Sequence, residues 1–349
     1  MEIEVYLAEC RAIVIDEIRH LVPKGSQGMR PVLYDLMLDY PLREAKALRP
    51  ALCIACCRAL GGRLDAVLSS AAVIELYHNA FLIHDDIEDG SSTRRGFQTL
   101  HLSHGVPVAI NVGDAMLALS LRPLLDNTRT MGLGRALRVL EVVSTMSELS
   151  VEGQALELDW IRNRRWDLSD EDYLVMAERK TAWYSFVAPL QIGGIAAGAA
   201  SEALDLLTRL GRMLGLAFQI QDDALNLEPD RIAYGKEANG DLWEGKRTLV
   251  LLHMLRSASS EERERSRAIL EKPRPPVGAQ IDGAKNDHDV AYLRDLINEY
   301  GSIEHARRVA HDLSRQAQDL ASGLTEWMKP SPHRDFLDGI IEYVHTRAH

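Results

Sequence analysis

The sequence predicts an all-α protein. Apolar residues recur at three- and four-residue spacings along most of the 349 residues, which is the periodicity of helices with one buried face. Runs of alternating residues rich in Val, Ile and Thr, which would indicate strands, are scarce. Glycines and helix-capping residues separate the periodic stretches, so we expect a succession of packed helices.

The periodicity indicates helices, in chain order, over residues 5–21, 50–60, 66–83, 114–125, 134–160, 172–198, 202–227, 248–257, 290–299 and 303–328. Asp65 precedes the third of these, and Ser169 and Asp170 precede the sixth, as residues that cap helix N-termini do. Gly61 and Gly62 follow the second helix, at a position where helix ends favour glycine.

A chain of this length holds two ordinary domains or one large one. The stretch 271–289 is rich in proline, glycine and polar residues, which is typical of an exposed loop. Only a short helical segment follows it. We therefore expect one helical domain, residues 1–349, with this loop on its surface.

The composition limits the partners. The formal net charge of −11 argues against nucleic-acid binding, which needs a basic surface, but permits a local basic pocket for a small anion. The sequence has no run of 18 apolar residues, so we expect no stable membrane insertion. The N-terminal stretch MEIEVYLAECRAIVIDEIRH lacks the charged-then-apolar layout of a signal peptide.

The cysteines are Cys10, Cys53, Cys56 and Cys57. No further Cys or His cluster completes a zinc site with them. We expect buried structural thiols in a reducing compartment, the cytoplasm.

Residues 80–96, AFLIHDDIEDGSSTRRG, run from apolar residues into four acids and then two arginines. Asp85 and Asp89 are four residues apart, so a helix places them on one face, where a cation between them would relieve their repulsion. The pattern F-x-I-x-D-D-x-x-[D/N] returns further along the chain, with Asp222 and Asn226 in the same relation. Two such helix ends across a cavity would hold magnesium and, through it, a phosphorylated substrate.

A structural interpretation of this repeat is two acid-rich helix ends in water. Acids at a helix C-terminus oppose the helix dipole, which disfavours that interpretation. Cations that could bind phosphate occur in several short contexts, and arginine suits phosphate because its planar group binds with two hydrogen bonds. These cations are Lys46, Arg49, Arg94, Arg95, Lys180, Lys236 and Lys246. Taken alone, each of five of them, Lys46, Arg49, Lys180, Lys236 and Lys246, is more readily explained as a solvated surface charge.

Seven segments together resemble the trans-polyprenyl diphosphate synthases, also called isoprenoid diphosphate synthases, including geranylgeranyl and farnesyl diphosphate synthases. These segments are AKALRP, ELYHNAFLIHDDIEDGSSTRRG, INVGDAML, VEGQALEL, ERKTAWYSF, FQIQDDALN and YGKEANGDLWEGKRTL. They cover most of residues 40–250 in the order that the family has them. The resemblance implies a single helical bundle around a central cavity (the isoprenoid synthase fold), a homodimer, and Mg²⁺ with three ions per site.

The resemblance also implies the roles of individual residues in condensing isopentenyl diphosphate with an allylic diphosphate. Magnesium would be bound by Asp85, Asp89 and Asp222. The allylic diphosphate would be held by Arg94, Lys180, Gln219, Lys236 and Lys246. Isopentenyl diphosphate would be held by Lys46, Arg49, His78 and Arg95. The carbocation left when diphosphate departs would receive oxygen dipoles from Thr181 and Gln219.

Two motifs depart from the family pattern. The first basic motif, G-G-K-R-x-R-P in the family, here has Glu44, Ala45 and Ala47 in place of two glycines and an arginine. The second acidic motif ends in Asn226 instead of aspartate, which offers a carbonyl oxygen but no charge. We expect the metal cluster to form through Asp222, with weaker binding.

The length of the product depends in the family on bulk just before the first aspartate. Here the fifth preceding residue, Ala80, is small, whereas the fourth, Phe81, is large. Phe81 and Tyr77 lie one and two turns before Asp85 on one helix face. We expect a C20 product, geranylgeranyl diphosphate, with C15 second; aromatic helix packing is the alternative explanation of Phe81.

Two other functions fit the same fold. A terpene cyclase would ionise an allylic diphosphate without isopentenyl diphosphate, and Ala47 and Asn226 favour it slightly. A non-catalytic partner subunit would need none of the acidic residues. The presence of Lys46, Arg49 and Asp222 argues for the elongating enzyme.

Overall fold

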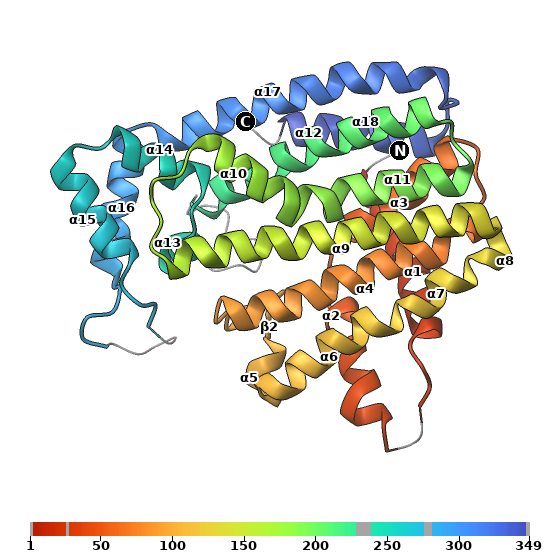
Figure 1. Ribbon diagram of the computed structural model, residues 1–349, viewed down its shortest axis with the longest axis horizontal. Helices are drawn as coiled ribbons and strands as arrows, with labels where there is room; N and C mark the ends of the chain where they lie inside the picture. Colours follow the sequence, from red (N-terminus) through yellow and green to blue (C-terminus); the bar gives the residue numbers. More distant parts are fainter. Residues whose placement is uncertain (1–2, 26–27, 228–238, 276–280, 347–349) are drawn as a thin grey trace. The chain divides into compact units, whose positions relative to one another are not determined.

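The computed structural model describes residues 3–25, 28–227, 239–275 and 281–346 (Figure 1). Its elements are almost all helices, which confirms the all-α fold, and the strands among these residues are only β1 (Thr93–Arg94) and β2 (Phe97–Gln98). The chain divides into two compact units. Unit 1 comprises Met1–Glu148, Trp183–Arg212 and Ala317–Tyr343, and unit 2 comprises Leu149–Ala182, Met213–Gln316 and Val344–His349. The single domain expected from the sequence stays a prediction.

Unit 1 is built around one apolar helix, α4. Its complete elements are α1 (Ile3–Leu21), η1 (Arg30–Tyr34), α2 (Asp35–Leu42), α3 (Leu48–Ala59), α4 (Leu64–Glu88), the β1–β2 pair, α5 (Leu100–His104), α6 (Val106–Leu119), α7 (Leu121–Asp126), α8 (Thr128–Met131), α11 (Ala188–Ala197) and η4 (Leu324–Glu326). Helix α4 packs against α1, α3, α6 and α11. Most of its residues are buried, because it is apolar on all sides.

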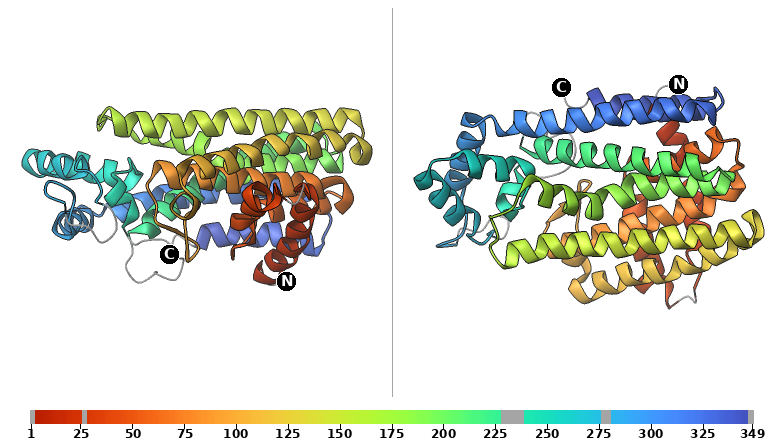
Figure 2. Two further views of the ribbon diagram at one scale, coloured as in Figure 1. Left: turned by 90° about the horizontal axis from the view of Figure 1, so that it is seen from below. Right: turned by 45° about the horizontal axis from the view of Figure 1, so that its top comes forward.

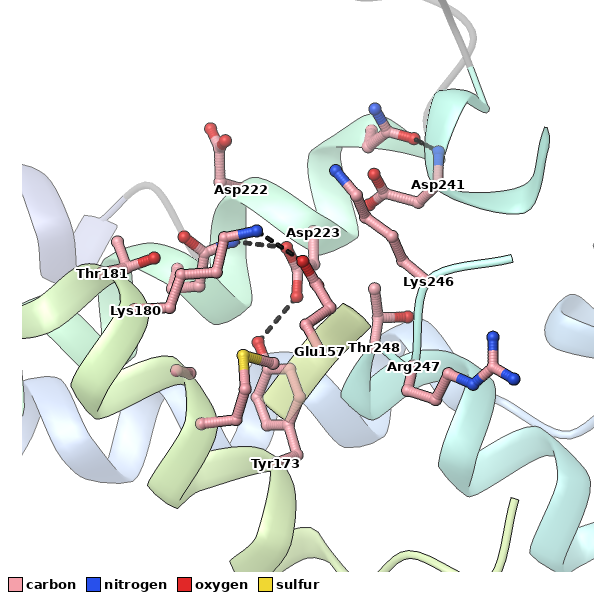
Figure 3. Close-up of a pocket in the computed structure, with 14 residues that line it drawn as sticks. Glu157, Tyr173, Lys180, Thr181, Asp222, Asp223, Asp241, Lys246, Arg247 and Thr248 are labelled. Carbon is pink, nitrogen blue, oxygen red and sulfur yellow. Dashed lines mark hydrogen bonds and ion pairs between the residues drawn. The ribbon is translucent and has the colours of Figure 1, made fainter. Parts of the chain in front are cut away.

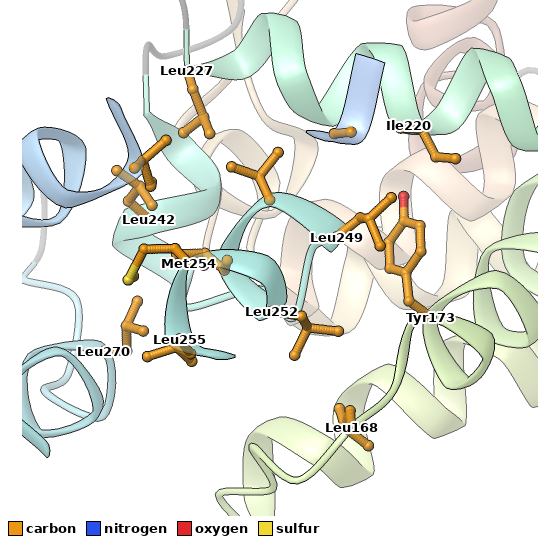
Figure 4. Close-up of a cluster of buried hydrophobic side chains, with 14 of the residues drawn as sticks. Leu168, Tyr173, Ile220, Leu227, Leu242, Leu249, Leu252, Met254, Leu255 and Leu270 are labelled. Carbon is orange, nitrogen blue, oxygen red and sulfur yellow. The ribbon is translucent and has the colours of Figure 1, made fainter. Parts of the chain in front are cut away.

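Unit 2 contains α10 (Asp170–Ala177), α13 (Gly240–Glu244), α14 (Leu249–Ser257), α15 (Ser260–Leu270) and α16 (Asp287–Glu299). Five elements have residues in both units: α9 (Leu133–Arg162), η2 (Glu178–Val187), α12 (Ser201–Asn226), α17 (Ser302–Gly323) and α18 (Pro332–Thr346). The core of unit 2 packs Leu249 and Leu252 of α14 with Ile220 of α12 and Tyr173 of α10 (Figure 4). Two further views of the ribbon show the courses of the long helices (Figure 2).

The expected helices are present, with three kinds of difference. Helix α6 begins at Val106, earlier than the expected 114–125. Helices α2, α5, α8, α13, α15 and α18 are additional. Helix α15 has few apolar residues but a capping box, in which Ser259 and Glu262 bond each other's backbone N–H. The expected helix 172–198 is interrupted by η2, a ten-residue π-helix.

The stretch 271–289, expected to be an exposed loop, is partly built into unit 2. Its last three residues begin α16, where Asn286 caps the helix. Lys285 is only 2% exposed, and its ammonium group donates to the carbonyl oxygens of Leu242, Trp243 and Leu270. Residues 276–280 lie outside the described residues.

The four cysteines are free and buried, as expected. Burial raises the pKa of each thiol, to about 12 for Cys10 and about 11 for Cys57. The cytoplasmic location stays a prediction.

Two helical stretches, Leu64–Glu88 and Val106–Met131, are long and apolar enough to cross a membrane by length and composition alone. The first is mostly buried inside the protein, as the core helix of a soluble domain is. The second is less buried, because α6 and α7 expose apolar side chains.

Candidate diphosphate and metal site

A polar pocket in unit 2 collects several of the residues predicted from the sequence (Figure 3). Helix α12 supplies Gln219, Asp222, Asp223 and Asn226, and η2 supplies Lys180 and Thr181. The remaining lining residues are Glu157, Tyr173, Met176, Ala177, Asp241, Lys246, Arg247 and Thr248. Lys236, predicted to bind the same ligand, lies outside the described residues.

A hydrogen-bonded trio fixes the floor of this pocket. The hydroxyl of Tyr173 donates to Asp223 Oδ2 over 2.6 Å, and Gln219 Nε2 donates to Asp223 Oδ1 over 2.6 Å. The ring of Tyr173 belongs to the apolar core, so the core holds its hydroxyl in place. Burial raises the pKa of Asp223, and the charge of Asp222 adds to that effect. Asp223 is therefore engaged within the protein, while its neighbour Asp222 points in a different direction (Figure 3).

Lys180 lies where two elements approach closely. Its ammonium group pairs with the buried carboxylate of Glu157 on α9. A Cβ on Gly153 would lie 2.3 Å from the backbone nitrogen of Lys180, so only glycine allows α9 to pass η2 at this point. A π-helix is often found at a functional site because it displaces side chains from α-helical positions.

Lys246 lies on the opposite wall, after α13. It pairs with Glu244 over 3.0 Å, and Glu244 also accepts from Arg274 over 2.9 Å. Asn226 Oδ1 accepts a hydrogen bond of 3.1 Å from the backbone nitrogen of Asp241. The side-chain carbonyl oxygen of Asn226, the oxygen that this residue could offer to a metal, thus accepts a hydrogen bond from the first turn of α13.

In unit 1 the acidic block ends α4 as expected, with Asp89 as the C-cap. One arginine of this block pairs with one of its acids. Arg94 pairs with Asp86, which is fully buried, and lies 3.7 Å from Asp85. Burial alone would lower the pKa of Arg94, but the hydrogen bond and charge of Asp86 outweigh it and raise this pKa. Asp86, not selected from the sequence, is the structural partner of the first arginine.

The other predicted cations of unit 1 include Arg49 on α3 and Lys46 in the loop that precedes this helix. Arg49 of α3 bonds to His78 Nε2, to the hydroxyl of Tyr184 and to Ser185 Oγ, over 2.8–3.2 Å. None of these three partners is a carboxylate, and Arg49 Nε has no hydrogen-bond partner among the described residues. Lys46 Nζ lies 3.5 Å from the hydroxyl of Tyr343.

Arg95 adds to the positive potential near Arg49. Burial lowers the pKa of Arg95, and the neighbouring guanidinium groups of Arg49, Arg94 and Arg43 lower it further. The charge of Glu75 acts in the opposite direction and raises this pKa, but it does not outweigh them. Several guanidinium groups close together are unfavourable unless an anion joins them. Unit 1 therefore concentrates positive charge around Arg95.

The residues predicted to set product length form an aromatic group in unit 1. Phe81 meets Tyr77 edge-on at 6.0 Å and Tyr184 edge-on at 5.7 Å between ring centroids. Tyr77 and Ala80 are buried, and Phe81 is half-buried. The same Tyr184 accepts from Arg49, so the aromatic group adjoins the cationic one.

The oxygen donors fit a hard divalent cation. Asp85 and Asp89 lie one turn apart at the end of α4, and Asp222 lines the pocket of unit 2. Magnesium usually binds through one or two carboxylates, with water and substrate phosphates completing its shell. In the described ranges, no three or more His, Cys, Asp or Glu side chains are grouped to hold a metal by themselves.

Three members of the pocket have no role predicted from the sequence: Glu157, Tyr173 and Asp223, although Asp223 is the second aspartate of the repeated acidic pattern. Tyr173 and Asp223 meet only because α10 packs on α12, and Glu157 meets Lys180 across α9 and η2. Glu157 lies in the segment VEGQALEL, which resembles the family without indicating a role for this residue. The feature of the sequence that could have indicated Glu157 is its position four residues after Gly153.

The chain is similar to known proteins over nearly its whole length. A short chain isoprenyl diphosphate synthase of Methanothermobacter thermautotrophicus is 32% identical over 344 residues, covering 96% of this chain and 99% of the relative. The geranylgeranyl pyrophosphate synthetase structure from Pyrococcus horikoshii has a TM-score of 0.83 at 30% identity, covering 98% of each chain. The polyprenyl synthase structure from Caulobacter crescentus, in complex with calcium and isoprenyl diphosphate, has a TM-score of 0.80 at 27% identity, covering 99% and 96%. Other curated relatives carry the names octaprenyl and geranylfarnesyl diphosphate synthase.

The all-α fold and these relatives define an enzyme of the prenyltransferase class. The family model described as polyprenyl synthetase matches residues 30–282, and the chain belongs to that family.

Proposed function

We propose that this enzyme condenses isopentenyl diphosphate with an allylic diphosphate in a magnesium-dependent reaction that releases diphosphate. The observation that carries the proposal is the unit 2 pocket, in which Lys180, Thr181, Gln219, Asp222 and Lys246 meet. The lysines lie among carboxylates in this pocket, an arrangement that suits a diphosphate bound together with a divalent cation.

Each side of the pocket supplies one part of the chemistry. Lys180 and Lys246 would neutralise the departing diphosphate, and Thr181 and Gln219 would direct oxygen dipoles at the allylic carbocation. The hydrogen bond from Gln219 to Asp223 fixes the amide, so that its carbonyl oxygen faces away from that carboxylate. In unit 1, Arg49, His78 and Arg95 would hold isopentenyl diphosphate, whose double bond attacks the cation.

Magnesium bound by Asp85, Asp89 and Asp222 would supply positive charge to the diphosphates. The calcium and isoprenyl diphosphate of the Caulobacter crescentus structure support this assignment. Three ions per site stay a prediction. After bond formation, the proton lost from the new chain would pass to the released diphosphate.

The proposed product is geranylgeranyl diphosphate, with farnesyl diphosphate second. The Pyrococcus horikoshii neighbour supports C20, and the aromatic group at Phe81 supports a limit on growth. The octaprenyl and geranylfarnesyl relatives show that similar chains carry other product names.

We also propose a homodimer. Helix α6 packs on α5 and α7, and these helices expose Leu102, Val106, Ile110, Leu121 and Leu125. Several exposed apolar side chains on helices that pack together favour a protein partner. Leu121→Lys with Leu125→Lys is expected to convert the dimer to a monomer in sedimentation. Val5→Lys on α1, also at an exposed apolar residue, is the control; a wild-type monomer contradicts the proposal.

One experiment tests the proposed activity. The protein is incubated with Mg²⁺ and dimethylallyl, geranyl or farnesyl diphosphate, with and without isopentenyl diphosphate, and the products are analysed. Longer diphosphates that form only with both substrates, and not after chelation of the metal, are expected. Hydrocarbons formed without isopentenyl diphosphate would identify a cyclase, and absence of turnover would identify a non-catalytic subunit.

A further inference from the structure

The strands β1 and β2 form a short hairpin, residues 93–98, that carries Arg94 and Arg95. Register pairs Thr93 with Gln98 and Arg94 with Phe97. A hairpin of two residues per strand is too short to hold its own shape in water. Arg95 also has a φ of 53°, a strained left-handed backbone. Something outside the hairpin must therefore hold these two arginines in place.

The support comes from Arg43, the residue that ends α2. Its Nη1 donates to the carbonyl oxygen of Arg94 over 3.0 Å, and its Nη2 donates to that of Gln98 over 2.8 Å. One guanidinium group thus joins both strands. The side chain is 7% exposed and lies over the rings of Tyr40, at 4.2 Å, and Phe97, at 5.6 Å.

Arg43 is itself oriented by α2. Asp39, one turn earlier, accepts from its Nε over 3.0 Å and from its Nη2 over 3.2 Å. The planar fork of arginine can satisfy a carboxylate and two carbonyl groups at once, whereas the single ammonium group of lysine cannot reproduce that geometry.

Tyr40 supports the same hairpin from its other side. Its hydroxyl donates to Asp86 Oδ2 over 2.7 Å and accepts from the backbone nitrogen of Leu100 over 3.2 Å. Asp86 holds the guanidinium group of Arg94. The carbonyl oxygen of Tyr40 accepts from Arg95 Nη1 over 3.0 Å. Each hairpin arginine is thereby connected to Tyr40, which is fully buried.

We infer that Tyr40 and Arg43 are positioning residues for substrate binding, acting through Arg94 and Arg95. The inference depends on the proposed function and on the roles that the family resemblance implies for the two arginines, in which Arg94 holds the allylic diphosphate and Arg95 holds isopentenyl diphosphate. Tyr40 and Arg43 lie before the basic segment AKALRP and form part of none of the segments that resemble the family. Their loss should weaken diphosphate binding more than it slows the chemical step, because they touch no reacting atom.

The test compares Arg43→Lys and Tyr40→Phe with Arg11→Lys. Arg11 Nη2 donates to the carbonyl oxygens of Leu42 and Arg43, over 3.2 and 3.1 Å, so it bonds the same turn without touching the hairpin. The measurements are KM for both substrates, kcat, the Kd of inorganic diphosphate with Mg²⁺ by calorimetry, and the unfolding temperature.

For Arg43→Lys and Tyr40→Phe we expect KM and the diphosphate Kd to rise about tenfold, with kcat within about threefold of wild type. Arg11→Lys should leave all three unchanged. If Arg43→Lys does not fold, Tyr40→Phe decides alone, because it removes only a hydroxyl. Wild-type KM and Kd in a folded Tyr40→Phe variant, or an equal rise in Arg11→Lys, overturn the inference. A wild-type protein that neither binds diphosphate nor turns over contradicts the proposed function itself.

Discussion

Phe81 is the residue at which the proposed product length is most directly open to test. Its ring lies between Tyr77 and Tyr184. Removal of the ring opens space along the face of α4 that leads away from Asp85. Phe81→Ala is therefore expected to lengthen the main product by at least one five-carbon unit, measured by chromatography of the dephosphorylated products.

Phe81→Leu keeps much of the bulk and serves as the matched control, with little change expected. An unchanged product in Phe81→Ala would assign the ring to helix packing alone. In that case the variant should lose stability by about 3–5 kcal/mol, as large-to-small core substitutions do.

Substitutions at Asn226 can distinguish a structural role of this residue from a role in metal binding. A carboxylate at this position could still accept from the backbone nitrogen of Asp241, so Asn226→Asp should fold normally. It would also add negative charge beside Asp222. We expect half-maximal activity at a Mg²⁺ concentration severalfold lower than in wild type.

The matched control is Asn226→Leu, which removes the accepted hydrogen bond and should lower stability by about 1–3 kcal/mol. A sharp loss of activity in a well-folded Asn226→Asp variant would contradict the assignment of this motif to magnesium.

At the scale of single elements, the π-helix η2 depends on a close approach to α12. A Cβ on Gly215 would lie 2.5 Å from Cα of Ala182, the residue after Thr181. Because a backbone atom cannot yield as a flexible side chain does, Gly215→Ala must shift η2. We expect a stability loss of about 1–3 kcal/mol and a clear fall in activity, from denaturant unfolding and product assays.

Gly134→Ala in α9 is the control, since its Cβ would meet nothing within 4 Å. It should be neutral or slightly stabilising, because alanine favours a helix over glycine by about 1 kcal/mol. Equal stability and activity of the Gly215→Ala and Gly134→Ala variants would show that η2 tolerates displacement.

The elements differ in how well their sequences predict them. Helices α4, α9 and α12 have long apolar periodicity, and all three were predicted. Helix α15 has little apolar periodicity, and it forms because caps and packing compensate. The π-helix was not predictable, because nothing in ERKTAWYSFV indicates that Gly153 and Gly215 will crowd it.

The residues of the site differ in the same way, since the sequence predicts some of them and not others. The repeated acidic pattern locates Asp85, Asp89 and Asp222, since their relation is local to one helix turn. Tyr173 and Asp223 are 50 positions apart, and their bond depends on how α10 packs on α12. Sequence therefore predicts the members of a helix face and leaves the partners from other helices to the fold.

At the scale of the whole molecule, Lys285 links stability to pH. Burial lowers its pKa to about 8, from an ordinary value near 10.5. Between these values the unfolded chain binds more protons than the folded one, so the free energy of unfolding rises with pH. Relative to Lys285→Met, the wild-type protein is expected to gain about 3 kcal/mol of stability from pH 8 to pH 10.5.

The measurement is denaturant unfolding across this range for the wild type, Lys285→Met and the exposed-site control Lys329→Met. The control should follow the wild type in parallel. A constant difference between wild type and Lys285→Met would mean that the ammonium group stays charged, held by the three carbonyl groups.

Unit 1 combines segments that are far apart in the sequence, and this sets the order in which its contacts can form during synthesis. The ring of Tyr6 in α1 stacks on Phe336 of α18 at 4.2 Å, and its hydroxyl bonds to His333. Helix α1 therefore cannot complete its packing until α18 has been synthesised. A nascent chain that stalls before residue 332 would leave the Tyr6 side of α1 uncovered, so synthesis must pass α18 before unit 1 can complete its packing.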